Sequence, residues 1–188
     1  MKYIEVEKKY VLDDADALRA TLADRGAKPG NHTRQIDTYY NAPHRDFLEP
    51  EAVSEWLRIR VEDNGDSSFN FKVWHPVDAL VKTHADEYET GVTDPEAVRR
   101  LLTALNFKEM IKVDKEREEW HLSGEVPVAV AIDTIENLGT FVEFEFKGEA
   151  ADAAEAAQLL TSFIDNLEAP LGDQVKKGYP HMMLGREH

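Results

Sequence analysis

The feature that most restricts the fold of this chain is a set of short segments in which charged and apolar residues alternate. The clearest is 55–62 (EWLRIRVE), where Arg58 and Arg60 alternate with Leu57 and Ile59. Successive side chains of a strand point to opposite faces of the sheet. The alternation therefore predicts strands with one ionic face and one apolar face.

Eight segments carry strand patterns, and three carry helical patterns. The strands are expected at 2–11, 35–41, 55–62, 68–74, 84–90, 112–122, 126–135 and 140–147. Asp13 and Asp14 supply N-cap chemistry for a first helix that Gly26 ends, and Pro95 opens a second helix that includes Leu105. A third helix is expected at about 151–167. Residues 172–188 form a short, mixed tail.

The charges on the ionic faces are sorted by sign. Acidic pairs are Glu5 and Glu7, Glu87 and Glu89, and Glu143 and Glu145; basic positions are Arg58 and Arg60, Lys72, and Lys115 and Arg117. For a single strand the simplest interpretation is a solvated face. Three amphipathic helices, however, need an apolar sheet surface to cover. If the helices pack outside, the ionic faces turn inward and line a barrel.

An interior lined with charges requires a highly charged ligand. Buried charge costs about several kcal/mol per ion unless it is paired or coordinates a metal. A triphosphate offers oxygens to basic side chains, and bidentate contacts suit Arg58, Arg60 and Arg117. The glutamate pairs would repel such a ligand unless they hold Mg²⁺ or Mn²⁺. The pattern therefore predicts metal-assisted phosphorus–oxygen chemistry.

Composition excludes several classes of function. The formal net charge of −15 argues against non-specific binding to nucleic acid or to an anionic membrane surface. The absence of cysteine excludes disulfides, thiolate metal sites and thiol nucleophiles. The charged N-terminus is no signal peptide, and no apolar stretch approaches the ~20 residues of a membrane span. We expect a cytoplasmic protein with a single domain over its 188 residues.

A weak internal echo is also present, since Glu5-x-Glu7 and Glu87-x-Glu89 lie 82 residues apart and each precedes a helix and a strand. Beyond this, a series of motifs resembles one family along nearly the whole chain. The motifs are Glu5-x-Glu7-x-Lys9, 35–47 (QIDTYYNAPHRDF), Leu57-Arg58-Ile59-Arg60, Phe71-Lys72, Glu87-Tyr88-Glu89, Lys115-x-Arg117, Asp133, 138–145 and 178–184. Together they resemble the CYTH group of triphosphate tunnel metalloenzymes. This group includes class IV adenylyl cyclases, thiamine triphosphatases and inorganic triphosphatases.

The resemblance implies an α+β fold, with a closed antiparallel eight-stranded β-barrel and helices packed outside, as a single CYTH domain over residues 1–188. It implies that Mg²⁺ or Mn²⁺ is held by Glu5, Glu7, Asp133, Glu143 and Glu145. It implies that phosphate is bound by Lys9, Arg58, Arg60, Lys72, Lys115 and Arg117. The catalytic residues would be Lys9, Arg60 and Lys72, and Glu87 and Glu89 would also line the tunnel.

The resemblance leaves three functions open. The first is hydrolysis of tripolyphosphate, thiamine triphosphate or ATP; the second is cyclisation of ATP to cyclic AMP and pyrophosphate; the third is binding of polyphosphate or nucleotide without catalysis. Ala85 stands where many relatives carry arginine, and Lys82 or His84 are candidate substitutes. No nucleic-acid or membrane partner is expected, and formation of a homodimer is left open.

Overall fold

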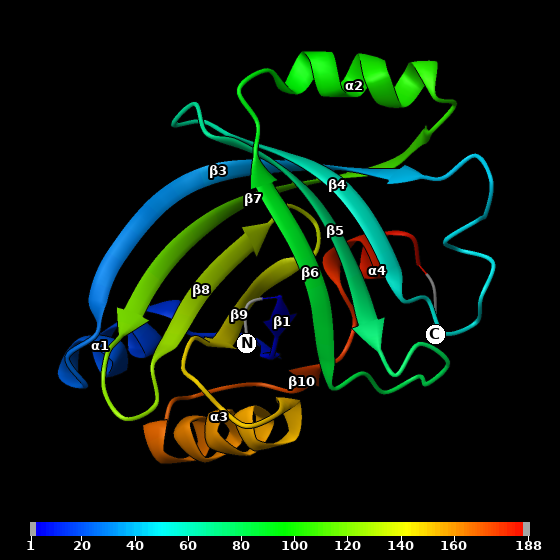
Figure 1. The fold of residues 1–188 in the computed structure, drawn as a ribbon. Coiled ribbons are helices and arrows are strands. Elements are labelled where there is room, and N and C mark those ends of the chain that lie inside the picture. Colours follow the sequence, from blue (N-terminus) through cyan, green and yellow to red (C-terminus); the bar gives the residue numbers. More distant parts are fainter. Residues whose placement is uncertain (1–2, 186–188) are drawn as a thin grey trace. The chain divides into compact units, whose positions relative to one another are not determined.

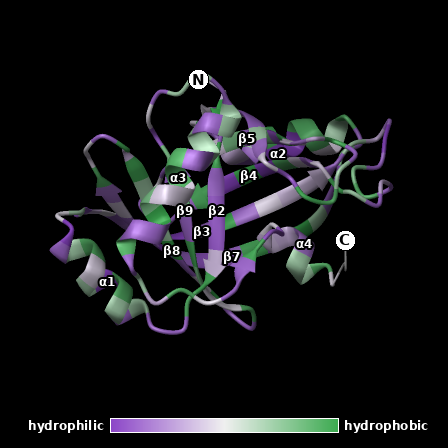
Figure 2. Ribbon diagram, turned by 90° about the horizontal axis from the view of Figure 1, so that it is seen from below, coloured by the Kyte–Doolittle hydropathy of each residue, from purple (hydrophilic) through white to green (hydrophobic). Residues whose placement is uncertain are grey.

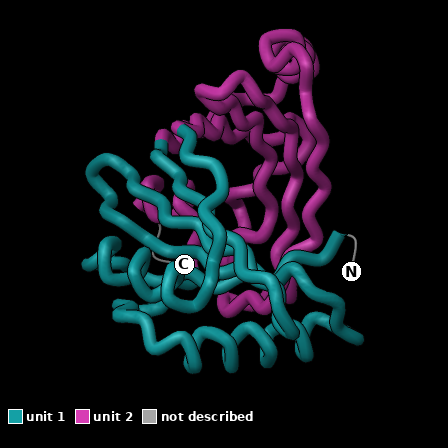
Figure 3. Tube along the Cα trace, turned by 90° about the vertical axis from the view of Figure 1, so that its left-hand side faces the viewer, with its two compact units in different colours: residues 1–33, 115–176 teal, residues 34–114, 177–188 magenta. Residues whose placement is uncertain are grey.

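The computed structural model describes residues 3–185 and separates into two compact units (Figure 3). Unit 1 contains residues 1–33 and 115–176, and unit 2 contains residues 34–114 and 177–188. Strands β3 (Lys28–Asn41) and β7 (Lys108–Leu122) are long, and each contributes one part to each unit. Lys2, which the first predicted strand included, and the last three residues of the predicted tail lie outside the described residues.

Unit 1 is an antiparallel sheet with two helices (Figure 1). Its strand order is β7-β8-β9-β2-β10. The bounds are β1 (Ile4–Glu5), β2 (Glu7–Val11), α1 (Ala15–Asp24), β8 (Val128–Ile135), β9 (Gly139–Phe146), α3 (Ala153–Leu167) and β10 (Gln174–Val175). None of the helices in residues 3–185 is both long and apolar enough to cross a membrane.

The core of unit 1 lies between the two helices and the apolar faces of the strands. Leu18 of α1 and Leu160 of α3 are fully buried in it, together with Val142 and Phe144 of β9. The helices carry both polar and apolar colours in Figure 2, as expected for elements that cover a sheet with one side only. Because alternate residues of β9 face this core, Glu143 and Glu145 lie on its opposite face.

Unit 2 has the strand order β6-β5-β4-β3. Its elements are β4 (Glu55–Glu62), β5 (Ser67–His75), β6 (His84–Gly91), α2 (Pro95–Ala104) and α4 (Tyr179–Met183), in addition to its parts of β3 and β7. Helix α2 contributes Leu102 to a smaller core with Phe47, Leu57 and Ile59. The alternate residues of β4, Arg58 and Arg60, therefore lie on the face away from this core.

The predicted helices and the eight predicted strand segments are present, and the α+β class is confirmed. The prediction of eight strands in a closed barrel was wrong in both respects. Ten strands occur in residues 3–185, in an open order that begins with β1 and ends with β10. The predicted strand at 2–11 is interrupted at Val6 and becomes β1 and β2, and β10 has only two residues, which is too short to produce a periodic pattern. Helix α4 was missed for the same reason.

The structure also contains a repeat: a capped helix followed by a long strand occurs twice, at a spacing of 80 residues rather than the 82 of the glutamate pairs. Asp14 caps α1 by accepting from Ala17 N, and Asp94 caps α2 by accepting from Ala97 N. Two residues after its last residue, each helix is followed by a residue with positive φ, and the next backbone N–H donates to a carbonyl of the last turn; the positive-φ residues are Gly26 (78°) and Asn106 (62°). The caps therefore match Glu7 with Glu87, and Glu5 with Ala85.

Substitution of a buried and of an exposed leucine tests how much each contributes to the free energy of unfolding. Leu160→Ala should lower the free energy of unfolding by about 2–5 kcal/mol, because it leaves a cavity in the core of unit 1. Leu101→Ala on α2, where 61% of the side chain is exposed, should change it by less than about 0.5 kcal/mol. Urea unfolding followed by circular dichroism measures both. Equal losses in the two variants would contradict this assignment of the core.

Candidate functional site

In unit 1, acidic and basic side chains are paired across neighbouring strands. Lys9 lies opposite Glu143 in the β2–β9 pairing, and its Nζ is 3.0 Å from Glu143 Oε1. Arg117 of β7 lies opposite Asp133 of β8 and donates two hydrogen bonds to its carboxylate, at 2.7 and 2.5 Å. Arg117 also donates to Glu143 Oε2 at 2.5 Å. Three strands thus converge on Glu143.

Asp133 is fully buried, and Lys115 is nearly so. Burial by itself would raise the pKa of Asp133, but the charges of Arg117 and of Lys115, whose Nζ is 3.6 Å away, outweigh it and lower this pKa. The carboxylate is therefore ionised and shared between two bases. Both of its oxygens accept a hydrogen bond from Arg117.

Burial and neighbouring positive charges also act in opposite directions on the pKa of Glu143. Burial would raise its pKa, whereas the positive charges of Lys9, Arg117 and Lys115 hold the pKa well below its usual range. A carboxylate with a depressed pKa stabilises the fold above the pKa that it has in the unfolded chain. That contribution is lost as the pH falls through the lower pKa of the folded state.

Four of the predicted metal ligands, Glu5, Glu7, Glu143 and Glu145, line one cavity of about 190 Å³ in unit 1. The wall that β7 contributes includes Glu119 and His121, and the cavity is also lined by the small residues Ala129 and Ala131 of β8. These two alanines separate β7 from β9 in the pairing, opposite Glu145 and Glu143. Their short side chains leave the space that the cavity occupies. Sequence reasoning missed Glu119 and His121, although both continue the two-residue period of Lys115 and Arg117.

The acidic side chains of this cavity suit a hard divalent cation. Glu7 lies directly opposite Glu145, an arrangement of like charges that destabilises a sheet unless a cation compensates. Lys147 forms an ion pair with Glu145. Within residues 3–185, no three acidic or histidine side chains already surround a common point as metal ligands do. Glu5, Glu7, Glu143 and Glu145 thus offer the right donor type, and Asp133 is not among the residues that line this cavity.

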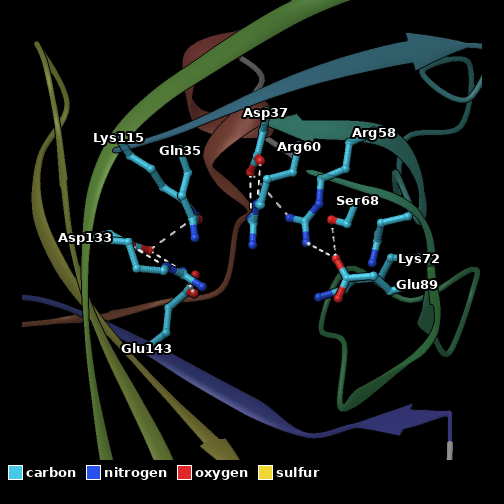
Figure 4. Close-up of polar contacts among 12 residues, drawn as sticks. Gln35, Asp37, Arg58, Arg60, Ser68, Lys72, Glu89, Lys115, Asp133 and Glu143 are labelled. Carbon is cyan, nitrogen blue, oxygen red and sulfur yellow. Dashed lines mark hydrogen bonds and ion pairs between the residues drawn. The ribbon is translucent and has the colours of Figure 1, made fainter. Parts of the chain in front are cut away.

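The ionic face of unit 2 is built around a second buried aspartate (Figure 4). Asp37 of β3 lies opposite Arg60 of β4 and is 1% exposed. Arg60 donates to both oxygens of Asp37, at 2.7 and 2.8 Å. Sequence reasoning gave Asp37 no definite role, because one aspartate in a strand is an uninformative pattern.

Arg58 is surrounded by acids at longer range. Its guanidinium lies 3.5 Å from Asp37, 3.8 Å from Glu87 and 3.9 Å from Glu89. Its buried Nε has no hydrogen-bond partner among the described residues. Burial would lower the pKa of Arg58, but these acids, Asp37 foremost, raise it above its ordinary value, so the group stays charged.

Lys72 completes the basic set of unit 2. Its Nζ lies 3.5 Å from Glu87 and 5.3 Å from the centre of the Trp74 ring. Glu87 also accepts a hydrogen bond of 2.6 Å from Asn70, and Glu89 accepts one from Ser68. The two glutamates that were expected to line the tunnel therefore orient neighbouring polar side chains on β5.

Neither of the two candidate residues replaces the arginine that many relatives carry at the position of Ala85. Ala85 is fully buried opposite Trp74 in the β5–β6 pairing. Lys82 instead ties the loop before β6 together by donating to Ser54 Oγ and to two backbone carbonyls. The ring of His84 stacks on His75 at 5.2 Å. Neither Lys82 nor His84 joins the ionic face.

The predicted residues thus fall into two groups, one in each unit. Unit 1 brings together Lys9, Lys115 and Arg117 with Glu5, Glu7, Asp133, Glu143 and Glu145. Unit 2 brings together Arg58, Arg60 and Lys72 with Glu87 and Glu89. Both groups combine buried cations with carboxylates, which is chemistry suited to binding a polyanion together with a metal ion.

Comparisons with known proteins point the same way. The sequence model of the CYTH domain matches residues 3–179. The chain is similar to the putative adenylate cyclase MJ0240 of Methanocaldococcus jannaschii, with 33% identity over 169 residues that cover 88% of this chain and 89% of that protein.

Two solved structures are similar in fold. The PH1819 protein of Pyrococcus horikoshii OT3 has a TM-score of 0.78 and 26% identity, covering 97% of this chain and 99% of that one. The putative adenylyl cyclase HpAC1 of Hippeastrum, described as having a dominant triphosphatase activity, has a TM-score of 0.66 and 16% identity, covering 99% and 97%.

The Lys9–Glu143 pair gives a prediction for stability. Lys9→Met should raise the pKa of Glu143, because burial is then opposed by fewer charges, and should lower the free energy of unfolding at pH 7 by about 2 kcal/mol. The difference from the wild type should shrink as the pH falls through the lowered pKa of Glu143 in the folded wild type. Denaturant unfolding at pH 7 and at pH values well below the pKa of a free glutamate, about 4, measures it.

Lys147→Met is the control, because it removes the partner of Glu145 at a site where about half of the lysine side chain is exposed. Its effect should stay below about 1 kcal/mol. A loss for Lys147→Met as large as that for Lys9→Met would show that burial does not set the strength of these pairs.

Proposed function

The chain belongs to the CYTH family, and on that premise we propose that it is a metal-dependent enzyme that hydrolyses the terminal phosphate of inorganic or organic triphosphates. The substrates that fit are tripolyphosphate, thiamine triphosphate and ATP. The observation that carries the proposal is the state of Arg58. A guanidinium that is 15% exposed, lies 3.5–3.9 Å from three acids and has a buried Nε without a hydrogen-bond partner among the described residues can exchange these contacts for phosphate oxygens.

The other basic residues have distinct proposed roles. Lys9 and Lys72 are compact positive charges on flexible stems, beside Glu143 and Glu87, that can follow a phosphate oxygen. Arg60 and Arg117 are fixed in place by aspartates and supply positive charge at defined positions. Preorganised charge of this kind stabilises the negative charge that shifts to the leaving group during phosphoryl transfer.

Mg²⁺ or Mn²⁺ bound by Glu5, Glu7, Glu143 and Glu145 would neutralise phosphate oxygens and favour attack by water. The cross-strand pair of Glu7 and Glu145 supports this assignment, because a cation would relieve the repulsion between them. Asp133 is left out of the proposed metal set and is assigned instead to holding Arg117 and Lys115.

Adenylyl cyclisation is the second candidate. The archaeal relative with 33% identity is named as a putative adenylate cyclase, and its similarity extends over most of both chains. In this reaction the ribose 3′-hydroxyl would attack the α-phosphorus and expel pyrophosphate. Both reactions use the same binding of a triphosphate, so product identification separates them. A third candidate, binding without turnover, rests on Ala85 in place of arginine.

A substrate screen tests the proposal directly. Incubation with Mg²⁺ or Mn²⁺ and each of tripolyphosphate, thiamine triphosphate and ATP should release orthophosphate from at least one. Chelation with EDTA should abolish the release. Cyclic AMP with stoichiometric pyrophosphate from ATP would identify a cyclase instead. Metal-dependent binding with no product from any of the three would leave only the non-catalytic function.

Two substitutions probe the two ionic faces separately. Glu7→Gln and Arg58→Gln should each lower kcat/KM by about 100-fold or more, because each removes a charge proposed to contact the metal or the phosphate. Matched controls are Glu116→Gln on β7 and Arg100→Gln on α2, where the side chains are 55% and 80% exposed. Steady-state kinetics on protein shown to be folded by circular dichroism gives the comparison. Near-normal rates for Glu7→Gln would remove Glu7 from the site.

A further inference from the structure

Asp37 stands between two arginines that differ in how firmly they are held. Its two carboxylate oxygens accept from Nε and Nη2 of Arg60, at 2.7 and 2.8 Å, in the fork geometry that fixes a guanidinium plane. The aspartate is 1% exposed and Arg60 is 9% exposed, so water does not compete for these bonds. Figure 4 shows Arg60 and Asp37 facing each other from β4 and β3.

Arg58, two residues earlier on the same strand face, has no bidentate contact with a carboxylate; it donates one long hydrogen bond to Asp37 Oδ2 and forms a hydrogen bond with the Tyr39 side chain. Its closest carboxylate oxygen belongs to Asp37 at 3.5 Å, and the contacts with Glu87 and Glu89 are longer. Its Nε is buried and has no hydrogen-bond partner within residues 3–185. One arginine is thus locked by the aspartate, while the other is attracted by charge but not fixed.

Unit 1 contains a similar arrangement, except that the arginine is on the earlier strand and the aspartate on the later one. There Asp133 lies opposite Arg117 and takes the fork at 2.7 and 2.5 Å. The second base, Lys115, again lies two residues earlier on the strand of the arginine, 3.6 Å from the aspartate. In both units a buried aspartate thus makes a bidentate contact with the arginine opposite it and a longer contact with the base two residues earlier.

Resting on the proposed function, we infer that Asp37 is a positioning residue that fixes Arg60 and leaves Arg58 as the guanidinium that exchanges its acidic contacts for ligand phosphate. An anion beside a triphosphate opposes its binding through charge, so Asp37 contributes geometry rather than affinity. Asp37→Asn should therefore lower kcat by at least about tenfold while KM stays the same or falls.

Arginine side-chain NMR separates this role from a merely structural one. In ¹H–¹⁵N spectra, the Nε–Hε signals of Arg58 and Arg60 are assigned with Arg58→Lys and Arg60→Lys. In the wild type, a hydrolysis-resistant analogue of tripolyphosphate with Mg²⁺ should shift the Arg58 signal and leave that of Arg60 in place. In Asp37→Asn, the Arg60 Hε should exchange with water at least about tenfold faster, as expected after loss of a charge-assisted hydrogen bond, and should shift with the ligand.

Asp114→Asn is the matched control. Asp114 also takes a bidentate contact from an arginine, Arg34, at 2.8 and 2.6 Å, but both side chains are about half exposed and away from the site. This variant should keep the wild-type kcat and the wild-type pattern of Arg58 and Arg60 signals. If it lowers kcat as much as Asp37→Asn, the effect is not specific to Asp37 and the inference is overturned.

The remaining outcomes are also decisive. A shift of Arg60 together with Arg58 in the wild type, or an Arg60 signal that ignores the ligand in Asp37→Asn, would refute the positioning role even if the enzyme hydrolyses triphosphates. An Arg58 signal that never responds to the analogue would refute the exchange. Conversely, the expected NMR pattern in a protein that releases no phosphate with Mg²⁺ or Mn²⁺ would support the positioning role and refute the proposed hydrolysis.

Discussion

The structure depends on keeping ionised side chains away from water without leaving any strong charge uncompensated. Asp133 is fully buried, and Lys9, Asp37 and Lys115 are nearly so. Each would be costly alone, at about several kcal/mol. The cost is offset because the strand register sets an acid opposite a base: Lys9 faces Glu143, Asp37 faces Arg60, and Arg117 faces Asp133. A slip of one residue in any of these pairings would turn the charges toward the apolar core.

Because each pairing needs only one acid and one base, the capped helix and the strand after it can repeat in the chain while the charges on that strand differ. The capped helices α1 and α2 repeat at 80 residues and fix where the following strands β3 and β7 begin. At that spacing Asp37 of β3 matches Arg117 of β7. The aspartate and the arginine have thus exchanged strands, and each pairing keeps one of each sign. An acid still lies opposite a base in both pairings, but the acid is on the earlier strand in one pairing and on the later strand in the other.

How much the sequence could predict follows from the range of each interaction. Two-residue alternation identified the ionic faces, and helix caps at Asp14 and Asp94 identified the helices, because both patterns are local. The order of ten strands was not predictable, since β10 carries too few residues for a pattern and no signal marks the break at Val6 between β1 and β2. The glutamates that line the cavity in unit 1 were predicted to face an interior, but the part played by Ala129 and Ala131 was not, because alanines between charged strands carry no sequence signal.

The two arginines of the LRIR segment show what a motif leaves out. In sequence, Arg58 and Arg60 are equivalent, since both lie on the same face of one strand. Their difference comes from β3, where Tyr39 lies opposite Arg58 and Asp37 lies opposite Arg60. Burial and the neighbouring Asp37 raise the pKa of Tyr39, so it stays neutral and leaves Arg58 without a formal counter-charge directly across the strand. The identity of one cross-strand neighbour thus decides which arginine makes a bidentate contact with a carboxylate and which does not.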